Sequence, residues 1–244
     1  MRVLTSLIAW TVWFFAQAVG VSAVGADVKP PPGAAPLKLV YASTDAGALE
    51  TSRWVFSDPT AWRVLKENDT SSLELTNQSN YKPLVRSPFN IALLSNLAVG
   101  SFTLEAELLQ TSREYGHRDL CVFFGFKSPT EFYYLHLATA ADNNAHNIFL
   151  VNKKPRAPVA TETTKGVEWG QNIWHKVRIE RRIEDGSVAV FFDDMKKPIM
   201  KARDQTFTKG LVGFGSFDDT GRFRNIRLYA DKTDKARISF SASP

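Results

Sequence analysis

The sequence predicts an all-β protein, a two-sheet antiparallel sandwich of the jelly-roll type. Three observations support this fold class. Short runs of alternating apolar and polar residues recur from residue 37 to residue 230, turn-forming residues separate them, and no segment has the spacing of an amphipathic helix. Many short strands without a repeat of fixed period favour a sandwich over a propeller. With 244 residues, 44% of them hydrophobic, the chain can form one large β domain.

The expected strands follow one another along the whole chain. On either side of its central region they are residues 37–43, 72–77, 79–88, 101–110, 173–182, 187–194, 197–203, 210–219 and 223–230. Side chains alternate between the two faces of a strand, so each run offers one face to a core. Asp185-Gly186 lies between two of the runs, where glycine supplies the positive φ that a tight hairpin requires.

Residues 1–26 differ in composition from the rest of the chain. Arg2 precedes an apolar segment, residues 7–19, and small residues follow it, which is the pattern of a cleaved secretory signal peptide. An uncleaved membrane anchor is the alternative, but Thr11 and Gln17 interrupt a run that is already short. We therefore expect a secreted or periplasmic protein that meets a membrane only during export.

Two further segments flank the expected domain. Residues 27–36 are rich in proline and predict an extended spacer. Residues 233–244 are expected to be a C-terminal tail, which leaves residues 37–232 for the jelly roll. Cys121 is the only cysteine, so an intramolecular disulfide is excluded. Its apolar neighbours predict a small packing residue rather than a nucleophile.

The central region, residues 115–152, holds three strand-like runs in which an apolar face alternates with a mixed one. The apolar face comprises Leu120, Val122, Phe124, Tyr133, Leu135 and Leu137. The mixed face comprises His117, Asp119, Cys121, Phe123, Phe132, Tyr134, His136, Asn147 and Phe149. If the apolar face packs inward, the mixed face forms an open surface. Rings beside hydrogen-bonding groups suit a sugar, whereas the alternative is simply a half-buried second face.

Individual residues have expected roles in such a sugar site. His136 is the best candidate for a general acid or base, because histidine titrates near neutrality. Asp119 shares a face with His117 and would hold its imidazole ring. The residues expected to contact the sugar, by polar contacts or by ring stacking, are His117, Asp119, Tyr134, His146, Asn147 and Trp169. For each histidine the alternative is a hydrogen bond to the backbone at a strand end. Trp174 opens an alternating strand and is expected in the core.

Charge and metal-ligand patterns narrow the possible partners. The net charge is +5, and basic clusters such as residues 153–156 suit an acidic polysaccharide or a membrane surface, or form a solvated face. No nucleic-acid motif is present, so nucleic acid is not an expected partner. No cofactor is required. Asp218 and Asp219 are candidate ligands of a structural calcium ion, with turn formation as the alternative, and no zinc spacing is visible.

The closing strands resemble a known family. Residues 210–229, GLVGFGSFDDTGRFRNIRLY, are similar to the last two strands of the 3-keto-disaccharide hydrolase-like family, within the concanavalin A-like lectin/glucanase jelly rolls. Shorter likenesses occur at residues 102–105, 133–142 and 174–178, in the order that the family uses. Where the family has a glutamine and a histidine between two glycines, this chain has Ser216-Phe217-Asp218-Asp219.

The resemblance implies a concanavalin A-like fold and hydrolysis of a glycosidic bond in an oligo- or polysaccharide. It also places Glu105 on the open side of a sheet, where this residue would handle protons together with His136. The Glu-x-Asp-x-Glu pattern of jelly-roll glucanases is absent, which favours the alternative of a non-catalytic lectin-like module or an envelope interaction module. Both function classes remain open at the level of the sequence.

Overall fold

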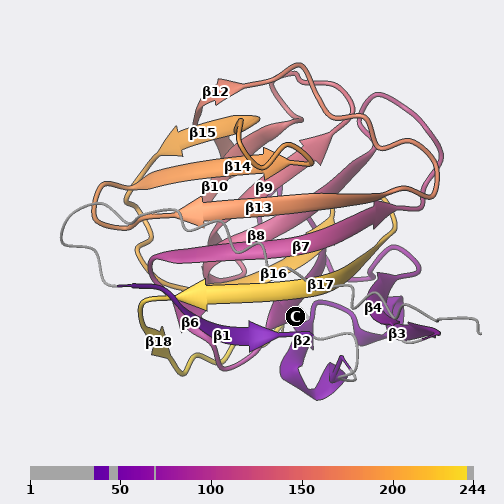
Figure 1. The fold of residues 1–244 in the computed structure, drawn as a ribbon, viewed down its shortest axis with the longest axis horizontal. Coiled ribbons are helices and arrows are strands. Elements are labelled where there is room, and N and C mark those ends of the chain that lie inside the picture. Colours follow the sequence, from indigo (N-terminus) through magenta and orange to yellow (C-terminus); the bar gives the residue numbers. More distant parts are fainter. Residues whose placement is uncertain (1–35, 44–48, 69, 241–244) are drawn as a thin grey trace, which may run out of the picture. The chain divides into compact units, whose positions relative to one another are not determined.

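The computed structural model describes residues 36–43, 49–68 and 70–240, and within them it confirms the predicted fold class. Two large antiparallel sheets pack face to face (Figure 1). The expected signal peptide, residues 1–26, lies outside the described residues, as does the expected spacer except for Pro36. In the part of the chain that is described, no helix is long and apolar enough to cross a membrane.

The first layer is a nine-stranded sheet. In spatial order its strands are β12 (Ala160–Thr163), β15 (Met200–Arg203), β14 (Ser187–Phe192), β13 (Trp174–Arg181), β7 (Phe102–Gln110), β17 (Gly221–Ala230), β4 (Thr70–Leu75) and β3 (Trp62–Glu67), with β1 (Lys38–Ala42) also paired to β17. The hairpin between β13 and β14 turns at Gly186, whose φ of 74° confirms the positive value expected from the sequence.

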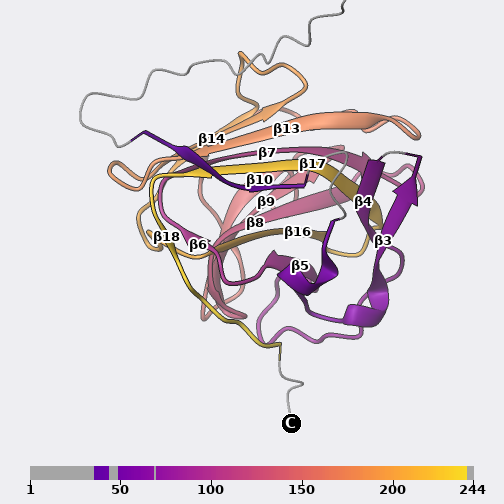
Figure 2. The same cartoon turned by 60° about the horizontal axis from the view of Figure 1, so that its bottom comes forward.

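The second layer is a seven-stranded sheet. Its strands, in spatial order, are β11 (Ala157–Pro158), β10 (Asn147–Asn152), β9 (Glu131–Ala138), β8 (Asp119–Ser128), β16 (Leu211–Ser216), β5 (Asn90–Leu94) and β2 (Trp54–Phe56). A small third sheet pairs β18 (Thr233–Asp234) with β6 (Ala98–Val99), and two short 3-10 helices are η1 (Thr51–Arg53) and η2 (Pro59–Ala61). Figure 2 shows the two large sheets as stacked layers.

The predicted apolar face of the central region forms the core between the sheets. Leu120, Val122 and Leu135 are fully buried there, together with Leu104 and Ile179 from the nine-stranded sheet. Removing such side chains from water is the main stabilising contribution, about 1.5–3 kcal/mol for each large one. The assignment of these residues to one inward face is confirmed.

The strand prediction is wrong at several places, and β2, β3 and β12 were not expected at all. Residues 79–88 form no strand, because Pro83 and Pro88 cannot donate to a ladder, and they run instead as an irregular segment. Conversely, β5 is a continuous buried run without alternation, which period-two patterns do not detect.

The mixed face of the central region is buried, although the sequence predicted an open surface there. Phe123, Phe126, Phe132, Tyr134 and Phe149 on this outer face of the seven-stranded sheet are at most 1% exposed. They form a second hydrophobic cluster, here called the outer core. The expectation of an open surface on this side is therefore wrong.

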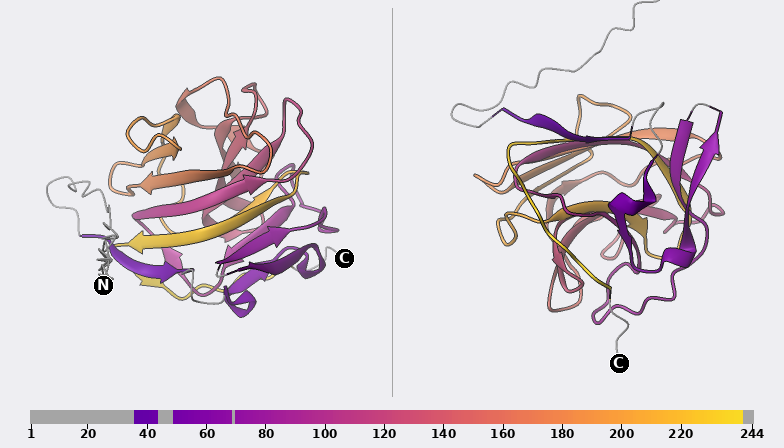
Figure 3. Two further views of the ribbon diagram at one scale, coloured as in Figure 1. Left: turned by 45° about the vertical axis from the view of Figure 1, so that its right-hand side comes forward. Right: turned by 90° about the horizontal axis from the view of Figure 1, so that it is seen from below.

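Two segments distant in sequence cover the outer core. Tyr81 and Val85 come from the irregular segment, and Ala236, Ile238 and Phe240 come from the chain after β18. Figure 2 and Figure 3 show this last segment passing beneath the seven-stranded sheet. The Phe240 ring lies 6.0 Å from Phe126 and 5.3 Å from Tyr81, centroid to centroid. The described part of the expected C-terminal tail thus packs as a lid on the sheet.

Candidate functional site

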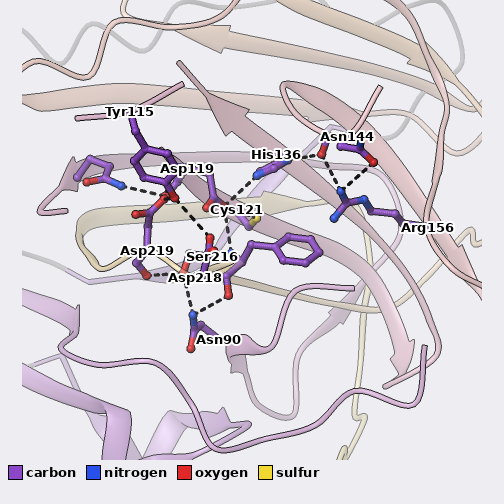
Figure 4. Close-up of polar contacts among 12 residues, drawn as sticks. Asn90, Tyr115, Asp119, Cys121, His136, Asn144, Arg156, Ser216, Asp218 and Asp219 are labelled. Carbon is purple, nitrogen blue, oxygen red and sulfur yellow. Dashed lines mark hydrogen bonds and ion pairs between the residues drawn. The ribbon is translucent and has the colours of Figure 1, made fainter. Parts of the chain in front are cut away.

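A cluster of polar side chains interrupts the outer core at one end of the seven-stranded sheet. Asp119 begins β8, and Cys121 follows on the same face because strand side chains alternate. His136 lies directly opposite Cys121 on β9 in the antiparallel register. Figure 4 shows these side chains converging with those of Asp218 and Asp219, from the turn between β16 and β17. We call this group the polar cluster.

Asp119 is the centre of the polar cluster. It is completely buried, and its Oδ2 accepts hydrogen bonds from the Cys121 thiol at 3.2 Å and from the Phe217 N–H at 3.1 Å. The same oxygen lies 3.1 Å from His136 Nε2. Its Oδ1 has no hydrogen-bond partner in the described part of the chain. A buried carboxylate oxygen without a partner is costly, by about 1–3 kcal/mol or more.

Asp219 brings a second buried carboxylate to the same place. Its Oδ2 accepts from the Tyr115 hydroxyl at 2.7 Å and from the Asp119 N–H at 2.8 Å. Burial, together with the neighbouring charge of Asp119, raises the pKa of Asp219 to about 6. Asp218, Asp219 and Asp119 present carboxylate oxygens within 4.8 Å of one another, so the two predicted calcium ligands do lie together. Calcium itself remains a prediction.

His136 is only 4% exposed, so it faces the outer core rather than an open surface. Its Nδ1 lies 3.2 Å from the backbone oxygen of Asn144, and its Nε2 lies beside Asp119. Both neighbours are acceptors, and a neutral imidazole has only one N–H to offer them. In this structure His136, the predicted general acid or base, is too deeply buried to contact a sugar directly.

The other polar residues of the prediction are dispersed. His117 is exposed, and its Nε2 lies 2.7 Å from Asp142 Oδ2, so the expected pairing with Asp119 is wrong. His146 is fully buried, its Nε2 lies 2.9 Å from the Thr164 hydroxyl, and burial lowers its pKa to about 4. The Asn147 amide oxygen accepts from the Ala160 N–H at 3.2 Å and is thereby engaged by the backbone.

Neither aromatic residue predicted to stack on a sugar is accessible. Tyr134 is completely buried in the outer core, where its ring stacks on Phe149 at 5.1 Å. Trp169 is 2% exposed and packs edge-on against His175 and Phe192 between the sheets. The prediction of these rings as sugar platforms is wrong, because each lies in a packed core.

Glu105 lies on a different surface from His136. It is half-buried on the outer face of the nine-stranded sheet, opposite Arg178 and Arg227 on the neighbouring strands. The core between the sheets separates it from His136, which projects from the outer face of the other sheet. One substrate cannot meet both residues, so their predicted joint action on protons is wrong.

The outer face of the nine-stranded sheet, here called the open face, carries a group that the sequence reasoning missed. The Arg224 guanidinium lies 4.0 Å from the centroid of the Trp174 ring, and its Nε donates to Glu107 Oε2 at 2.8 Å. Trp174 is half-buried on this face, so its expected core position is wrong. It shares a strand face with Lys176, which is exposed, and this polar alternation was the available signal.

Comparisons with known proteins identify the fold and no family. No family model matches the chain, and no curated protein matches it. Among solved structures, the carbohydrate-binding module CBM66 from Bacillus subtilis is similar with 14% identity and a TM-score of 0.52, over 73% of this chain and 96% of that one. Peanut lectin is similar with 12% identity and a TM-score of 0.51, over 83% of this chain and all of that one.

A Bacillus subtilis protein of unknown function with a galectin-like fold gives the same TM-score of 0.51, with 11% identity, over 83% of this chain and all of that chain. At such identities the likeness concerns the fold alone. The described part of the chain is therefore a concanavalin A-like jelly-roll sandwich, as in lectins and carbohydrate-binding modules.

Proposed function

We propose that the protein is an exported, non-catalytic glycan-binding jelly roll whose ligand surface is the open face around Trp174. The observation that carries the proposal is the arrangement of Trp174, Arg224 and Glu107, a flat ring with a hydrogen-bonded ion pair beside it. The C–H face of a sugar stacks on an aromatic ring while its hydroxyls need donors and acceptors at fixed positions. This group offers both.

The charge of the open face favours an acidic glycan. Lys176, two residues from Trp174 on β13, is exposed, as is Arg227 on β17. Lys201 and Arg203 are exposed on β15 of the same sheet, where they pair with Glu162 and Asp185. Their alternation along each strand directs them outward from the sandwich. Positive side chains on one surface attract a polyanion and orient it. We therefore expect uronic-acid oligosaccharides to bind more tightly than neutral ones of the same length.

The covered face gives the second support for this proposal. Tyr134, His136 and Phe149, the residues expected to line a sugar site there, are sealed beneath the irregular segment and the chain after β18. Of the two outer sheet surfaces, the open face is the one that presents polar and aromatic side chains to solvent. The names of the structural neighbours agree with sugar binding as a function that this fold supports.

Hydrolysis of a glycosidic bond is the second candidate. Glu105 and Glu107 share the open face at a spacing of two residues along β7. Retaining and inverting glycosidases both use a pair of carboxyl groups, one on each side of the bond. In this chain Glu107 is ion-paired with Arg224, and Glu105 lies opposite Arg178 and Arg227 on the neighbouring strands, so both carboxylates have basic neighbours.

One experiment separates the two functions. The purified protein is titrated with neutral, 3-keto and uronic-acid oligosaccharides in a calorimeter, and the same mixtures are followed by mass spectrometry. We expect saturable binding of the acidic sugars with unchanged masses, and a loss of affinity of about tenfold or more in Trp174→Ala, since stacked aromatics dominate such contacts. Leu84→Ala, an exposed apolar residue elsewhere, is the matched control.

A product that has gained the mass of water would instead establish a hydrolase. Its loss in both Glu105→Gln and Glu107→Gln would assign the reaction to the open face. Absence of binding across the whole panel would contradict the proposal.

A further inference from the structure

The polar cluster contains donors of three different kinds that the proposed function does not use. Cys121 offers Sγ, His136 offers an imidazole nitrogen and Asp119 offers a carboxylate oxygen, and these atoms all lie within 4.8 Å of one another. The sheet creates the grouping: Asp119 and Cys121 are two residues apart on one strand, and His136 is the cross-strand neighbour of Cys121. The alternation in the sequence placed all three on one mixed face, but which of them meet is determined by the register of the two strands.

Two of the three groups carry a buried atom that lacks a hydrogen-bond partner among the described residues. These atoms are His136 Nε2, which lies 3.1 Å from Asp119 Oδ2 without the geometry of a hydrogen bond, and Asp119 Oδ1, on side chains that are 4% and 0% exposed. Figure 4 shows the imidazole directed at the Asp119 carboxylate. Buried polar atoms of native proteins are nearly always satisfied, so two together indicate a missing ligand that accepts electron pairs from nitrogen and oxygen.

The charge of the cluster points to a cation. Asp119, Asp218 and Asp219 gather carboxylates within 4.8 Å, and two of them are buried. The nearby guanidinium groups do not pair with these carboxylates: Arg118 donates to Gln110 and Gly170, and Arg156 lies 4.4 Å from the centroid of the Phe217 ring and donates to the Asn144 backbone oxygen. A bound divalent ion would offset the repulsion among the carboxylates.

We propose that Asp119, Cys121 and His136 form a binding site for a zinc-class transition-metal ion. A thiolate, an imidazole and a carboxylate are the ligands that Zn²⁺ takes in proteins, whereas Ca²⁺ and Mg²⁺ require oxygen ligands. Binding converts the Cys121 thiol to a thiolate and releases its proton to solvent. Of the five side chains of the polar cluster, Asp218 is the one exposed to solvent.

Such an ion would hold together three parts of the fold. It would join β8 to β9 and, through the hydrogen bonds of Asp119 to Phe217 and Asp219, to the turn between β16 and β17. In a chain whose single cysteine excludes an intramolecular disulfide, this metal would supply a cross-link between strands. A ligand bound only by the native state raises its stability by mass action.

The test uses the full protein without a histidine tag, stripped with a chelator and titrated with Co²⁺ and Zn²⁺. We expect one equivalent of Co²⁺, a thiolate-to-cobalt charge-transfer band, displacement by Zn²⁺ and a higher Tm with zinc. Cys121→Ser should lose the charge-transfer band, and His136→Gln should weaken binding by at least about 10–100-fold, the loss seen even when only a hydrogen-bond partner of a metal ligand is changed. Circular dichroism verifies that each variant is folded.

His117→Gln is the matched control, because His117 is exposed and paired with Asp142 outside the cluster. This variant should bind the metal as the wild type does. Two results would overturn the proposal: a folded wild-type protein that gives no charge-transfer band, or one that binds Ca²⁺ but not Zn²⁺, which would assign the cation to the aspartates alone.

Discussion

The two outer faces of the sandwich differ in what covers them. The outer face of the seven-stranded sheet lies under chain from residues 76–89 and 233–240, and its aromatic residues are buried as completely as those between the sheets. The open face of the nine-stranded sheet carries arginine and glutamate side chains that pair across strands, including the Arg224–Glu107 and Arg222–Glu74 pairs. The same alternation in sequence therefore leads to a second core in one place and a solvated surface in the other.

Polar groups behave differently on the two faces for this reason. On the open face, charges pair across strands in water and each pair contributes about 0–1 kcal/mol. On the covered face, Asp119 is fully buried, and desolvation by burial is the main reason that the pKa of its neighbour Asp219 is raised. A charged residue in an alternating strand pattern therefore affects the free energy of unfolding much more on the covered face than on the open face.

The largest loss of stability should follow the truncation of an aromatic residue of the outer core. Phe123→Ala removes a fully buried ring that lies 5.8 Å from Phe132, centroid to centroid. We expect the free energy of unfolding to fall by about 3–5 kcal/mol, measured by urea denaturation. A loss below about 1 kcal/mol would mean that the covering segments do not seal this face in solution, and the comparison would fail.

Acid should destabilise the fold through His146, which is fully buried next to Thr164. Its pKa of about 4 in the folded protein lies below the unfolded value of 6.5, so the unfolded state takes up the proton first. The contribution is present above pH 6.5 and is lost as the pH falls towards 4, by about 3 kcal/mol in total. Asp219, whose pKa is raised, acts in the opposite sense, so the wild-type curve combines both.

The His146 contribution is obtained by difference. Unfolding free energies of the wild type and of His146→Gln are measured at several pH values between 7 and 4. The wild type should lose more stability on acidification than the variant does. Parallel curves would contradict the assignment of a buried, neutral His146.

A smaller loss of stability is expected for a change in the chain after β18, which covers the outer core. Phe240 is partly buried and contacts Tyr81 and Phe126, so Phe240→Ala should cost about 1–2 kcal/mol. The variant should also expose Phe126 enough to bind a hydrophobic dye. Leu84→Ala, at a residue 69% exposed, serves as the control and should stay within about 0.5 kcal/mol. Equal values for the two variants would show that the chain after β18 does not dock.

The smallest change in stability belongs to the open face. Arg224→Ala removes a partly exposed ion pair and a contact with the Trp174 ring, and we expect a loss of about 1 kcal/mol or less. Affinity for an acidic oligosaccharide should nevertheless fall, because the guanidinium is part of the proposed surface. A large loss of stability with unchanged affinity would reverse the roles that the comparison assigns to the two faces.

The sequence predicted which residues share a face better than it predicted which face is open. Asn147 and Phe149 do lie beside His136 and Tyr134, because period two and the antiparallel register determine this directly. The cover comes from two segments distant in sequence, around Tyr81 and Val85 and from residues 236–240, and the strands that they cover carry no sign of it. The alternation of Ala236, Ile238 and Phe240 was the signal that the expected tail packs against a sheet.

The candidate site was predictable only in part. Asp218 and Asp219 were expected to act together, and they do lie together. The meeting of Asp119, Cys121 and His136 depends on strand register and could not be read from spacing. Trp169 and Trp174 exchanged their expected places: Trp169 in its loop is buried, and Trp174 is half-buried on the open face, because the face of a strand residue depends on its phase.

The most direct test of this account follows the indole N–H signals of the protein by NMR during titration with a uronic-acid oligosaccharide. Trp174→Phe and Trp169→Phe assign the two signals that matter. We predict that the Trp174 signal shifts in a saturable manner while the Trp169 signal, from a residue 2% exposed, stays in place. A stationary Trp174 signal with a shifted Trp169 signal would contradict the open face as the glycan-binding surface.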